Sequence, residues 1–340
     1  MPKRSEAKPS LPMIRLVLVS PVIGELERRR FDVRPVLEKF SITRENVFDP
    51  DFWVPASKMY GLFEEFAVYT HDPYFGVRQG ELLNPWGWSP TARAAQESSS
   101  VVEFLLRFMA DSQQDVNSCD YCLNTVGDRT TLHERRRSDG SILPRHNDGY
   151  TVTYLLSILR GAVGESWNGK HVMAQVCDPG VIPPGYLGIR TAKTDTLGAR
   201  ISFPTHWLLL SFGSTTKAEE TLPRAISSAP LSGIVDAFRF AISPHIHESW
   251  LDTERAAELC GMSKRTLARK LRNRGTTCYR EICQLRRKRA KQQLMETKLD
   301  IARIGVSVGY PDPVVFSRAF KRWTGQSPSE FRNRSIPEGD

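Results

Sequence analysis

The sequence predicts a mixed α/β N-terminal domain followed by an all-α C-terminal domain, in which a long helix joins two helix–turn–helix units. Up to about residue 215, segments with helical periodicity alternate with strand-like ones, whereas residues 231–334 are helical almost throughout. The length of 340 residues suits about two domains, each with its own core. We therefore expect one domain at 11–215, a linker at 216–230 and a second domain at 231–334.

The N-terminal domain begins with a run at 14–19 that fits either a buried strand or the start of a helix. Helices are expected at 35–40 and 55–69, each with a proline in its first turn, where proline is tolerated. The second of these has apolar residues at spacings of three and four, which indicates one buried face. They are Met59, Leu62, Phe63 and Phe66.

The rest of this domain mixes helices and strands. We expect a turn at 71–76 and a helix at 101–109, opened by the serines at 98–100. Strands are expected within 115–137, with a turn at 127–128 between two of them. A helix at 150–163 then leads to strands near 171–176 and 199–203. The prolines and glycines at 179–185 indicate that the connection between these two strands is a loop.

The first helix–turn–helix unit of the C-terminal domain is predicted from caps and glycines. Asp252 is a good N-cap for a helix at 253–260, and Gly261 supplies the turn. Ser263 then caps a helix at 264–274, which buries Leu267 and Leu271 and leaves its polar residues outside that stripe.

The second unit repeats this pattern. Asp300 caps a helix at 301–308, Gly309 turns the chain, and Asp312 caps a helix at 313–323 with a proline in its first position. Phe316 and Phe320 are expected to be buried. Between the units, a helix at 279–298 would span roughly 30 Å, which is close to one turn of B-DNA at roughly 34 Å. Its inward residues are Ile282, Leu285, Ala290 and Leu294, and its basic side is Arg286, Arg287, Lys288, Arg289 and Lys291.

The positive charge belongs to this C-terminal domain. The whole chain has a formal net charge of +9. Residues 250–334 contain 20 Lys and Arg against 8 Asp and Glu, whereas residues 1–249 contain 27 against 28. Such a local excess indicates a polyanionic partner, with nucleic acid ahead of a membrane.

Two runs in this domain resemble the reading units of the AraC/XylS family of transcription regulators. They are AELCGMSKRTLARKL at 257–271 and GYPDPVVFSRAFKRWTGQSPSEFR at 309–332. The resemblance implies sequence-specific binding to double-stranded promoter DNA, with base readers at Arg265, Thr266, Ala268 and Arg269 in the first unit. In the second unit the matching positions are Pro313, Val314, Ser317 and Arg318. Pro313 and Val314 replace polar readers, and Gly305 replaces a usual alanine, so we expect the first unit to carry most of the specificity.

The full set of residues expected to contact DNA combines the exposed positions of both recognition helices with the basic side of the long helix. It is Ser263, Lys264, Arg265, Thr266, Arg269, Lys270, Asn273, Arg286, Arg287, Val314, Ser317, Arg318, Lys321 and Arg322.

The N-terminal domain resembles, less sharply, the arabinose-binding-type sensor domain of one AraC subgroup. The matching segments are FWVP at 52–55, the helix at 63–67, DPYFGVRQG at 72–80 and ISFPTHWL at 201–208. The resemblance implies a small-molecule sensor or dimerisation module and does not define its ligand. Candidate ligand-binding residues are Trp86 and Trp88, for stacking, and Arg135 and Arg137, for a carboxylate or phosphate. A plug over the core and a solvated strand edge are the alternatives for these pairs.

Other functions are weaker candidates. Cys119 and Cys122 form a C-x-x-C pair that would suit a redox or metal sensor, but residues three apart in a strand face opposite sides. His171, Cys177 and Asp178 could imitate a nucleophile and base, yet no catalytic motif accompanies them. We expect no enzymatic activity, no cofactor and no metal site. A DNA-binding protein without any ligand is the further alternative.

The expected protein is thus a metabolite-responsive regulator, in the first instance an activator that contacts RNA polymerase and forms a homodimer. Its apolar runs fall short of the roughly 18 residues that cross a bilayer. Arg15 and Pro21 interrupt the segment that most resembles a signal peptide. The six unevenly spaced cysteines favour reduced thiols. We therefore expect a cytoplasmic protein with no membrane partner.

Overall fold

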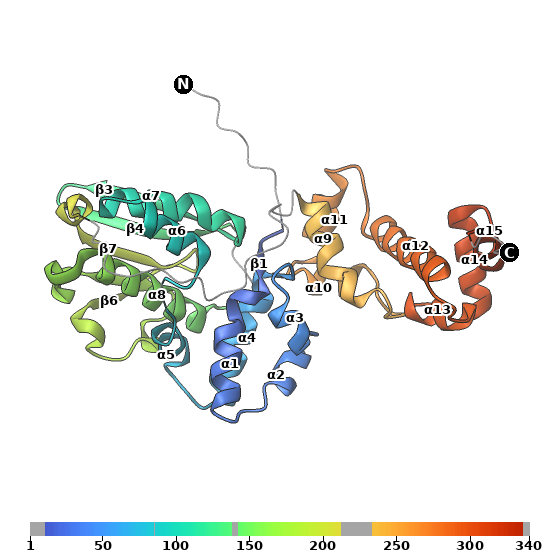
Figure 1. Ribbon diagram of the computed structural model, residues 1–340, viewed down its shortest axis with the longest axis horizontal. Coiled ribbons are helices and arrows are strands. Elements are labelled where there is room, and N and C mark those ends of the chain that lie inside the picture. The colour runs from blue at the N-terminus through green and yellow to red at the C-terminus, as the bar shows by residue number, and fades with distance from the viewer. Residues whose placement is uncertain (1–10, 85, 138–141, 212–232, 336–340) are drawn as a thin grey trace, which may run out of the picture. The chain divides into compact units, whose positions relative to one another are not determined.

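The computed structural model describes residues 11–84, 86–137, 142–211 and 233–335 (Figure 1). The chain divides into two compact units, one within Pro12–Pro230 and the other within Leu231–Asp340 together with Leu11. The predicted linker at 216–230 lies outside the described residues. Within the described part of the chain, no helix is long and apolar enough to cross a membrane.

The N-terminal unit opens with a short two-stranded sheet. Strand β1 (Met13–Arg15) pairs antiparallel with β2 (Trp53–Pro55). The run at 14–19 therefore combines the two predicted alternatives, because β1 passes directly into a 3₁₀ turn at Leu16–Val19. The helices between the two strands are α1 (Ser20–Arg28), α2 (Arg34–Lys39) and α3 (Arg44–Phe48).

A five-stranded sheet forms the rest of the framework, with the strand order β3-β4-β7-β5-β6. Neighbouring strands are antiparallel except β5 and β6, which are parallel. Strand β6 was not predicted, because its sequence RTAK lacks alternating apolar residues and most of it is exposed. The strands are β3 (Cys119–Val126), β4 (Arg129–Arg136), β5 (Met173–Val176), β6 (Arg190–Lys193) and β7 (Arg200–Pro204).

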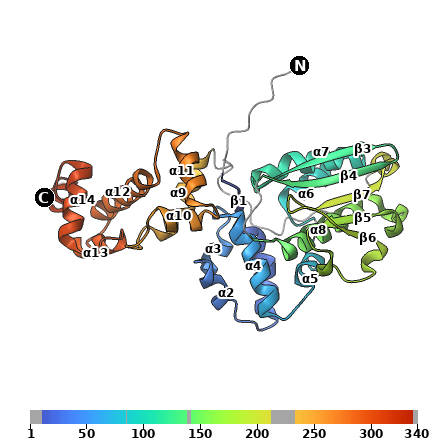
Figure 2. The same cartoon turned by 180° about the vertical axis from the view of Figure 1, so that it is seen from behind.

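Helix α8 (Arg145–Val163) is the central helix of this unit. Figures 1 and 2 show it against the sheet, where it contacts β5 and β7. The other helices are α4 (Ala56–Tyr69), α5 (Phe75–Glu81), α6 (Ser89–Glu97) and α7 (Val101–Asp111). Helix α5 was not predicted, since two glycines weaken its helical pattern. Those glycines let α5 approach α8 closely: a Cβ on Gly76 would overlap the carbonyl oxygen of His146.

A buried ion pair connects the sheet to α8. The guanidinium of Arg136 on β4 donates to the carboxylate of Asp148 on α8, and both side chains are almost fully buried. Arg136 also donates to the carbonyl oxygen of Thr196 at 3.2 Å. As predicted for a strand, its neighbours Arg135 and Arg137 lie on the opposite, exposed face.

The C-terminal unit is all helical. Helix α9 (Ile234–Ile242) precedes the first helix–turn–helix unit, α10 (Thr253–Leu259) and α11 (Lys264–Arg272). The long helix α12 (Cys278–Glu296) leads to the second unit, α13 (Ile301–Ser307) and α14 (Pro313–Thr324), and then to α15 (Pro328–Ser335).

The predicted caps of the C-terminal unit form. The side chains of Asp252, Ser263, Asp300 and Asp312 each accept a backbone N–H in the first turn of α10, α11, α13 and α14. The turn glycines Gly261 and Gly309 have φ of 61° and 81°, a left-handed conformation that favours glycine. Gly305 has a packing role, because a Cβ there would lie only 3.2 Å from the side chain of Phe316.

Arg286 is buried, contrary to the prediction from the sequence. It was expected on the exposed basic side of α12, but it is only 8% exposed. Its guanidinium donates to the carbonyl oxygens of Ile246 at 3.1 Å and Glu248 at 2.7 Å, and it stacks over the ring of Tyr310, with 5.2 Å from Cζ to the ring centroid. The basic run from 286 to 289 misled the prediction, because α12 packs against both helix–turn–helix units and buries part of this side. Arg286 is therefore a structural residue and does not face a DNA surface.

Replacing Arg136 by methionine should lower the free energy of unfolding by about 3–5 kcal/mol, because the carboxylates of Asp148 and Glu134 would stay buried without a cation. Arg135→Met is the matched control and should change it by less than about 0.5 kcal/mol, since Arg135 is exposed. Urea denaturation measures both. Equal effects of the two variants would refute the structural role of Arg136.

Replacing Arg286 by methionine should destabilise the C-terminal unit by about 2–3 kcal/mol, since its hydrogen bonds from a charged donor are lost. Arg287→Met, at the exposed neighbouring position, should change stability by less than about 0.5 kcal/mol. Hydrogen exchange of the amides of α12 in the full chain reports the difference. Unchanged protection in the Arg286 variant would contradict this assignment.

Candidate nucleic-acid interface and ligand cavity

Helix α11 presents a polar, cationic surface. Leu267 and Leu271 are fully buried and anchor the helix, while Lys264, Arg265 and Arg269 are exposed. Arg265 and Arg269 are four residues apart, so they lie on the same face of the helix. Burial and the nearby positive charge of Arg269 lower the pKa of Lys270. The face therefore concentrates positive charge at a site that an anion would neutralise.

Ser263 and Lys264, at the start of α11, have structural partners within the domain. The hydroxyl of Ser263 accepts the backbone N–H of Thr266 and lies 2.9 Å from its hydroxyl, so Ser263 acts as an N-cap. Lys264 pairs with Glu254 on α10 at 3.2 Å, with both side chains exposed. Asn273, which follows the last turn, is exposed.

Helix α14 presents a different surface. Phe316 and Phe320 are buried, and Arg318, Lys321 and Arg322 are exposed while Ser317 is half-buried. At the start of the helix, the apolar side chains of Val314 and Val315 are 57% and 47% exposed. The exposed side of this helix is therefore apolar in the first turn and basic in the later turns.

Helix α12 connects the two helices and adds exposed cations. Arg287 is exposed, and its guanidinium also donates to the carbonyl oxygen of Trp323 at the end of α14, at 3.3 Å. Ala290 and Leu294 of α12 pack into the core of the second unit. Nineteen residues make α12 about 28 Å long.

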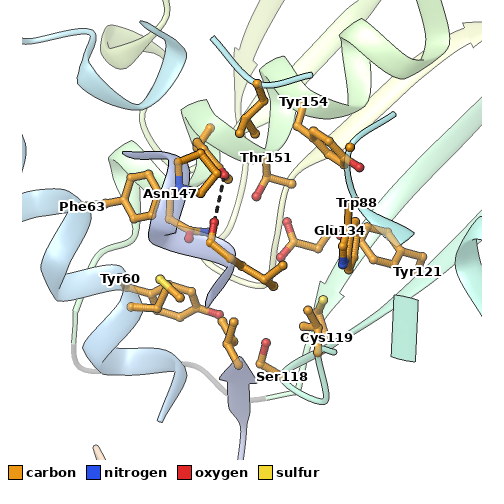
Figure 3. A pocket seen from close by; sticks show the side chains of 18 of the residues that line it. Tyr60, Phe63, Trp88, Ser118, Cys119, Tyr121, Glu134, Asn147, Thr151 and Tyr154 are labelled. Carbon is orange, nitrogen blue, oxygen red and sulfur yellow. Dashed lines mark hydrogen bonds between the residues drawn. The ribbon is translucent and has the colours of Figure 1, made fainter. Parts of the chain in front are cut away.

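The N-terminal unit contains a cavity of about 330 Å³. Side chains from β1, α4, α8, β3 and β4 line it, and so do Leu82, Leu83, Asn84, Gly87 and Trp88. Its walls are mainly aromatic and aliphatic, including Tyr60, Phe63, Tyr121 and Tyr154 (Figure 3). Burial raises the pKa of Tyr60 and Tyr154 far above the usual range of tyrosine, so these phenols stay neutral. The cavity suits a small, largely apolar molecule.

Of the four predicted ligand-binding residues, one lines the cavity and three do not. Trp88 lines the cavity, is buried, and its indole N–H donates to Asp115 at 2.7 Å. Trp86 is absent from the cavity wall and instead packs edge-on against Phe104, with ring centroids 5.9 Å apart. The alternative of a plug over the core therefore describes Trp86.

Arg135 and Arg137 are also absent from the cavity wall. Both lie near Asp120 on β3, at 3.9 Å and 2.6 Å, on the exposed face of β4. Neither arginine lines this cavity, because strand alternation turns both side chains away from it. The same alternation aims Glu134 inward, and Glu134 lines the cavity. Glu134 was not among the predicted ligand-binding residues. Its place next to Arg135 on a predicted strand indicates that the two side chains face opposite sides of the sheet.

Strand alternation also places the side chains of Cys119 and Cys122 on opposite faces of β3. Cys119 is buried and lines the cavity, and burial raises its pKa well above the usual value. Cys122 is half-buried and its sulfur contacts the carbonyl oxygen of His133 at 3.8 Å. Burial also raises the pKa of Cys177 to about 12, which makes it a poor nucleophile near neutral pH. Among the residues that the structure describes, no cluster of three or more His, Cys, Asp and Glu side chains is arranged to hold a metal ion.

Comparison with known proteins matches both units. Residues 31–180 match the family model described as the arabinose-binding domain of AraC transcription regulators, and residues 256–334 match a helix-turn-helix domain model. Together these matches cover well over half of the chain.

Curated relatives match a part of the chain. The HTH-type transcriptional regulator VqsM of Pseudomonas aeruginosa is 38% identical over 77 residues, which are 23% of this chain and 24% of that protein. The arabinose operon regulatory protein of Salmonella typhimurium is 36% identical over 104 residues, which are 30% of this chain and 36% of that protein. The aligned region thus spans about a quarter to a third of these relatives.

Solved structures give weaker similarity. The transcriptional regulator CdpR of Pseudomonas aeruginosa aligns with 91% of this chain and 98% of its own, at 18% identity and a TM-score of 0.37. The C-terminal domain of AraT from Geobacillus stearothermophilus aligns with 33% of this chain and 94% of its own, at 32% identity and a TM-score of 0.30. On the two domain matches and the curated relatives, the chain belongs to the AraC/XylS family of transcription regulators.

Proposed function

We propose that this protein is a sequence-specific DNA-binding transcription regulator that responds to a small molecule. Both recognition helices of one chain, α11 and α14, enter adjacent turns of the major groove. A ligand in the N-terminal unit then changes the domain arrangement or dimer geometry. The liganded protein occupies a promoter-proximal site, contacts RNA polymerase and activates transcription.

One observation carries the DNA-binding part of this proposal: two capped helices with exposed basic faces are both packed on the same long helix. The length of α12, about 28 Å, is near the roughly 34 Å that separate successive major-groove openings on one face of B-DNA. A single basic helix would be more consistent with an ordinary solvated face. Two such helices at a fixed separation favour a double reader.

Helix α11 is the better reader of bases. The exposed guanidinium groups of Arg265 and Arg269 are suited to bidentate hydrogen bonds with guanine O6 and N7. Thr266 and Ala268 offer a hydroxyl and a methyl group beside them. Each good bidentate contact is worth about 1–3 kcal/mol of discrimination between bases.

Helix α14 suits a different kind of contact. The exposed Val314 offers methyl groups for thymine, while Arg318, Lys321 and Arg322 suit phosphates. Arg287 on α12 adds a further phosphate contact. This half of the domain would thus contribute affinity and shape recognition more than base specificity.

Regulation by a ligand is supported by the cavity in the unit that matches the arabinose-binding domain model. The names of three relatives contain a small metabolite, arabinose in two and ornithine in one. A ligand that binds one arrangement of the protein better than another shifts the population toward that arrangement. A ligand-independent DNA-binding protein, the alternative, would show no ligand-linked change in DNA affinity.

A genome-wide footprint of the purified full chain on fragments of its own genomic DNA tests the proposal. We expect discrete protected sites of about two helical turns. Protection without discrete sites would contradict sequence-specific recognition. A repeat with a ligand candidate shows whether occupancy is ligand-dependent.

Arg269→Ala should relax base preference at one position of the site and cost about 1–3 kcal/mol on the preferred sequence, because one bidentate contact is lost. Arg287→Ala should weaken binding to all sequences about equally and reduce the slope of log affinity against log salt by about 0.9. Selection from a randomised site and salt titrations measure these effects. Uniform loss in both variants would show that Arg269 is not a base reader.

Inserting five base pairs between the two halves of a footprinted site should reduce affinity at least tenfold. The insertion turns the second half to the opposite face of the duplex, since one turn takes about 10.5 base pairs. An insertion of ten base pairs should not restore binding, because α12 fixes the separation of α11 and α14. Unchanged affinity after either insertion would argue against two readers on one rigid domain.

A further inference from the structure

We infer that the cavity of the N-terminal unit binds a small organic cation with an apolar body and one protonated amine that pairs with Glu134. This inference rests on the proposed ligand-responsive function and specifies its ligand class. It distinguishes this cavity from one that holds a sugar.

The walls of the cavity argue against a sugar. A monosaccharide carries hydroxyl groups on nearly every carbon, and each of them needs a hydrogen-bond partner when buried. The cavity is lined mostly by aliphatic and aromatic side chains, such as Ile14, Met59 and Phe63. Its polar side chains include Glu134 and Thr151, which lie near each other in Figure 3, and Ser118 and Asn147 on other parts of the wall. Glu134 is the charged residue among the described lining residues, so a ligand with one charged end and an apolar body suits this cavity.

Glu134 is a buried charged side chain of the cavity wall, with Cys119 and Thr151 as polar neighbours. The residue is 5% exposed, and its Oε2 atom has no hydrogen-bond partner within the described part of the chain. Figure 3 shows its carboxylate directed toward the interior of the cavity. A buried acceptor without a donor is costly, and a ligand that supplies the donor removes this cost.

The balance of buried charge favours a cationic donor over a neutral one. Glu134 and Asp148 are both buried carboxylates, and Arg136 is the buried guanidinium between them. Arg136 donates directly to Asp148, while its Nε lies 4.0 Å from Oε1 of Glu134. The single positive charge of Arg136 thus lies between two carboxylates and can neutralise only one of their charges. An ammonium group at Oε2 would neutralise the remaining charge.

The aromatic walls suit the same ligand. Trp88 and Tyr121 line the same cavity as Glu134, so aromatic rings form part of the wall that a bound cation would face. Aromatic faces attract cations, most strongly where water is excluded. The volume of about 330 Å³ limits the ligand to a small molecule.

Binding of such a cation would depend on pH. Burial raises the pKa of Glu134, with the charge of Arg136 acting in the opposite direction. Below this raised pKa the carboxyl group is protonated in the empty cavity and must lose its proton when the cation binds. Affinity should therefore fall as pH falls through that pKa, while a neutral ligand would show no such loss.

Isothermal titration of the full chain with matched ligands tests the inference. The probes are n-alkylamines from butyl to octyl and 2-phenylethylamine, each compared with the alcohol of the same chain, and L-arabinose. At least one amine should bind ten times more tightly than its alcohol, and more tightly than L-arabinose. Its affinity should decrease as the pH is lowered.

Glu134→Gln should remove both the preference for the amine and the pH dependence. Glu165→Gln, the same change at an exposed position, should leave both intact. If the Glu134 variant does not fold, the pH dependence of the unmodified chain still decides the question. Equal binding of amines and alcohols, tighter binding of L-arabinose, or no binding of any amine would overturn the inference. Discrete DNA footprints alongside any of these results would show that only the ligand class is wrong.

Discussion

The buried guanidinium of Arg286 holds the C-terminal domain in one arrangement. It donates to the carbonyl oxygens of Ile246 and Glu248, before the first helix–turn–helix unit, and stacks on Tyr310, in the turn of the second. Gly309 makes room for it, since a Cβ there would overlap the guanidinium. A buried cation is tolerated only while its donors have acceptors. Both units must therefore stay in place around α12, and this constraint gives α11 and α14 a defined separation.

The N-terminal domain uses the same physics with a different result. Arg136 connects β4 to α8 through Asp148, much as Arg286 connects two parts of the C-terminal domain. Here, however, a second carboxylate, Glu134, lies in the same buried region. In the C-terminal domain the buried charge is satisfied by backbone carbonyls, which leaves the exposed cations available for DNA. In the N-terminal domain the charge is incompletely balanced next to a cavity, which is where a ligand would complete it.

Local signals explain which parts of the fold were predictable. The N-caps at Ser263 and Asp312 and the turn glycine Gly309 act within a few residues of themselves, so the helices of the C-terminal domain were recognised correctly. In the N-terminal domain, α5 was missed because Gly76 reads locally as a helix breaker. Its actual role is contact with α8, which is distant in sequence. The ligand candidates show the same limit, since only Trp88 of the four lines the cavity.

The sequence by itself determined the all-α C-terminal domain, its capped helices, its basic charge and its family resemblance, because these depend on neighbouring residues and composition. The tertiary structure decided which charged side chains are buried and which are exposed. Arg286 and Arg287 are adjacent in one basic run, and so are Arg135 and Arg136, yet one member of each pair is buried and the other exposed. The difference comes from which elements pack against each side of α12 and β4. Burial then sets the role of each residue, since a charge removed from water must find a partner in the protein or in a ligand.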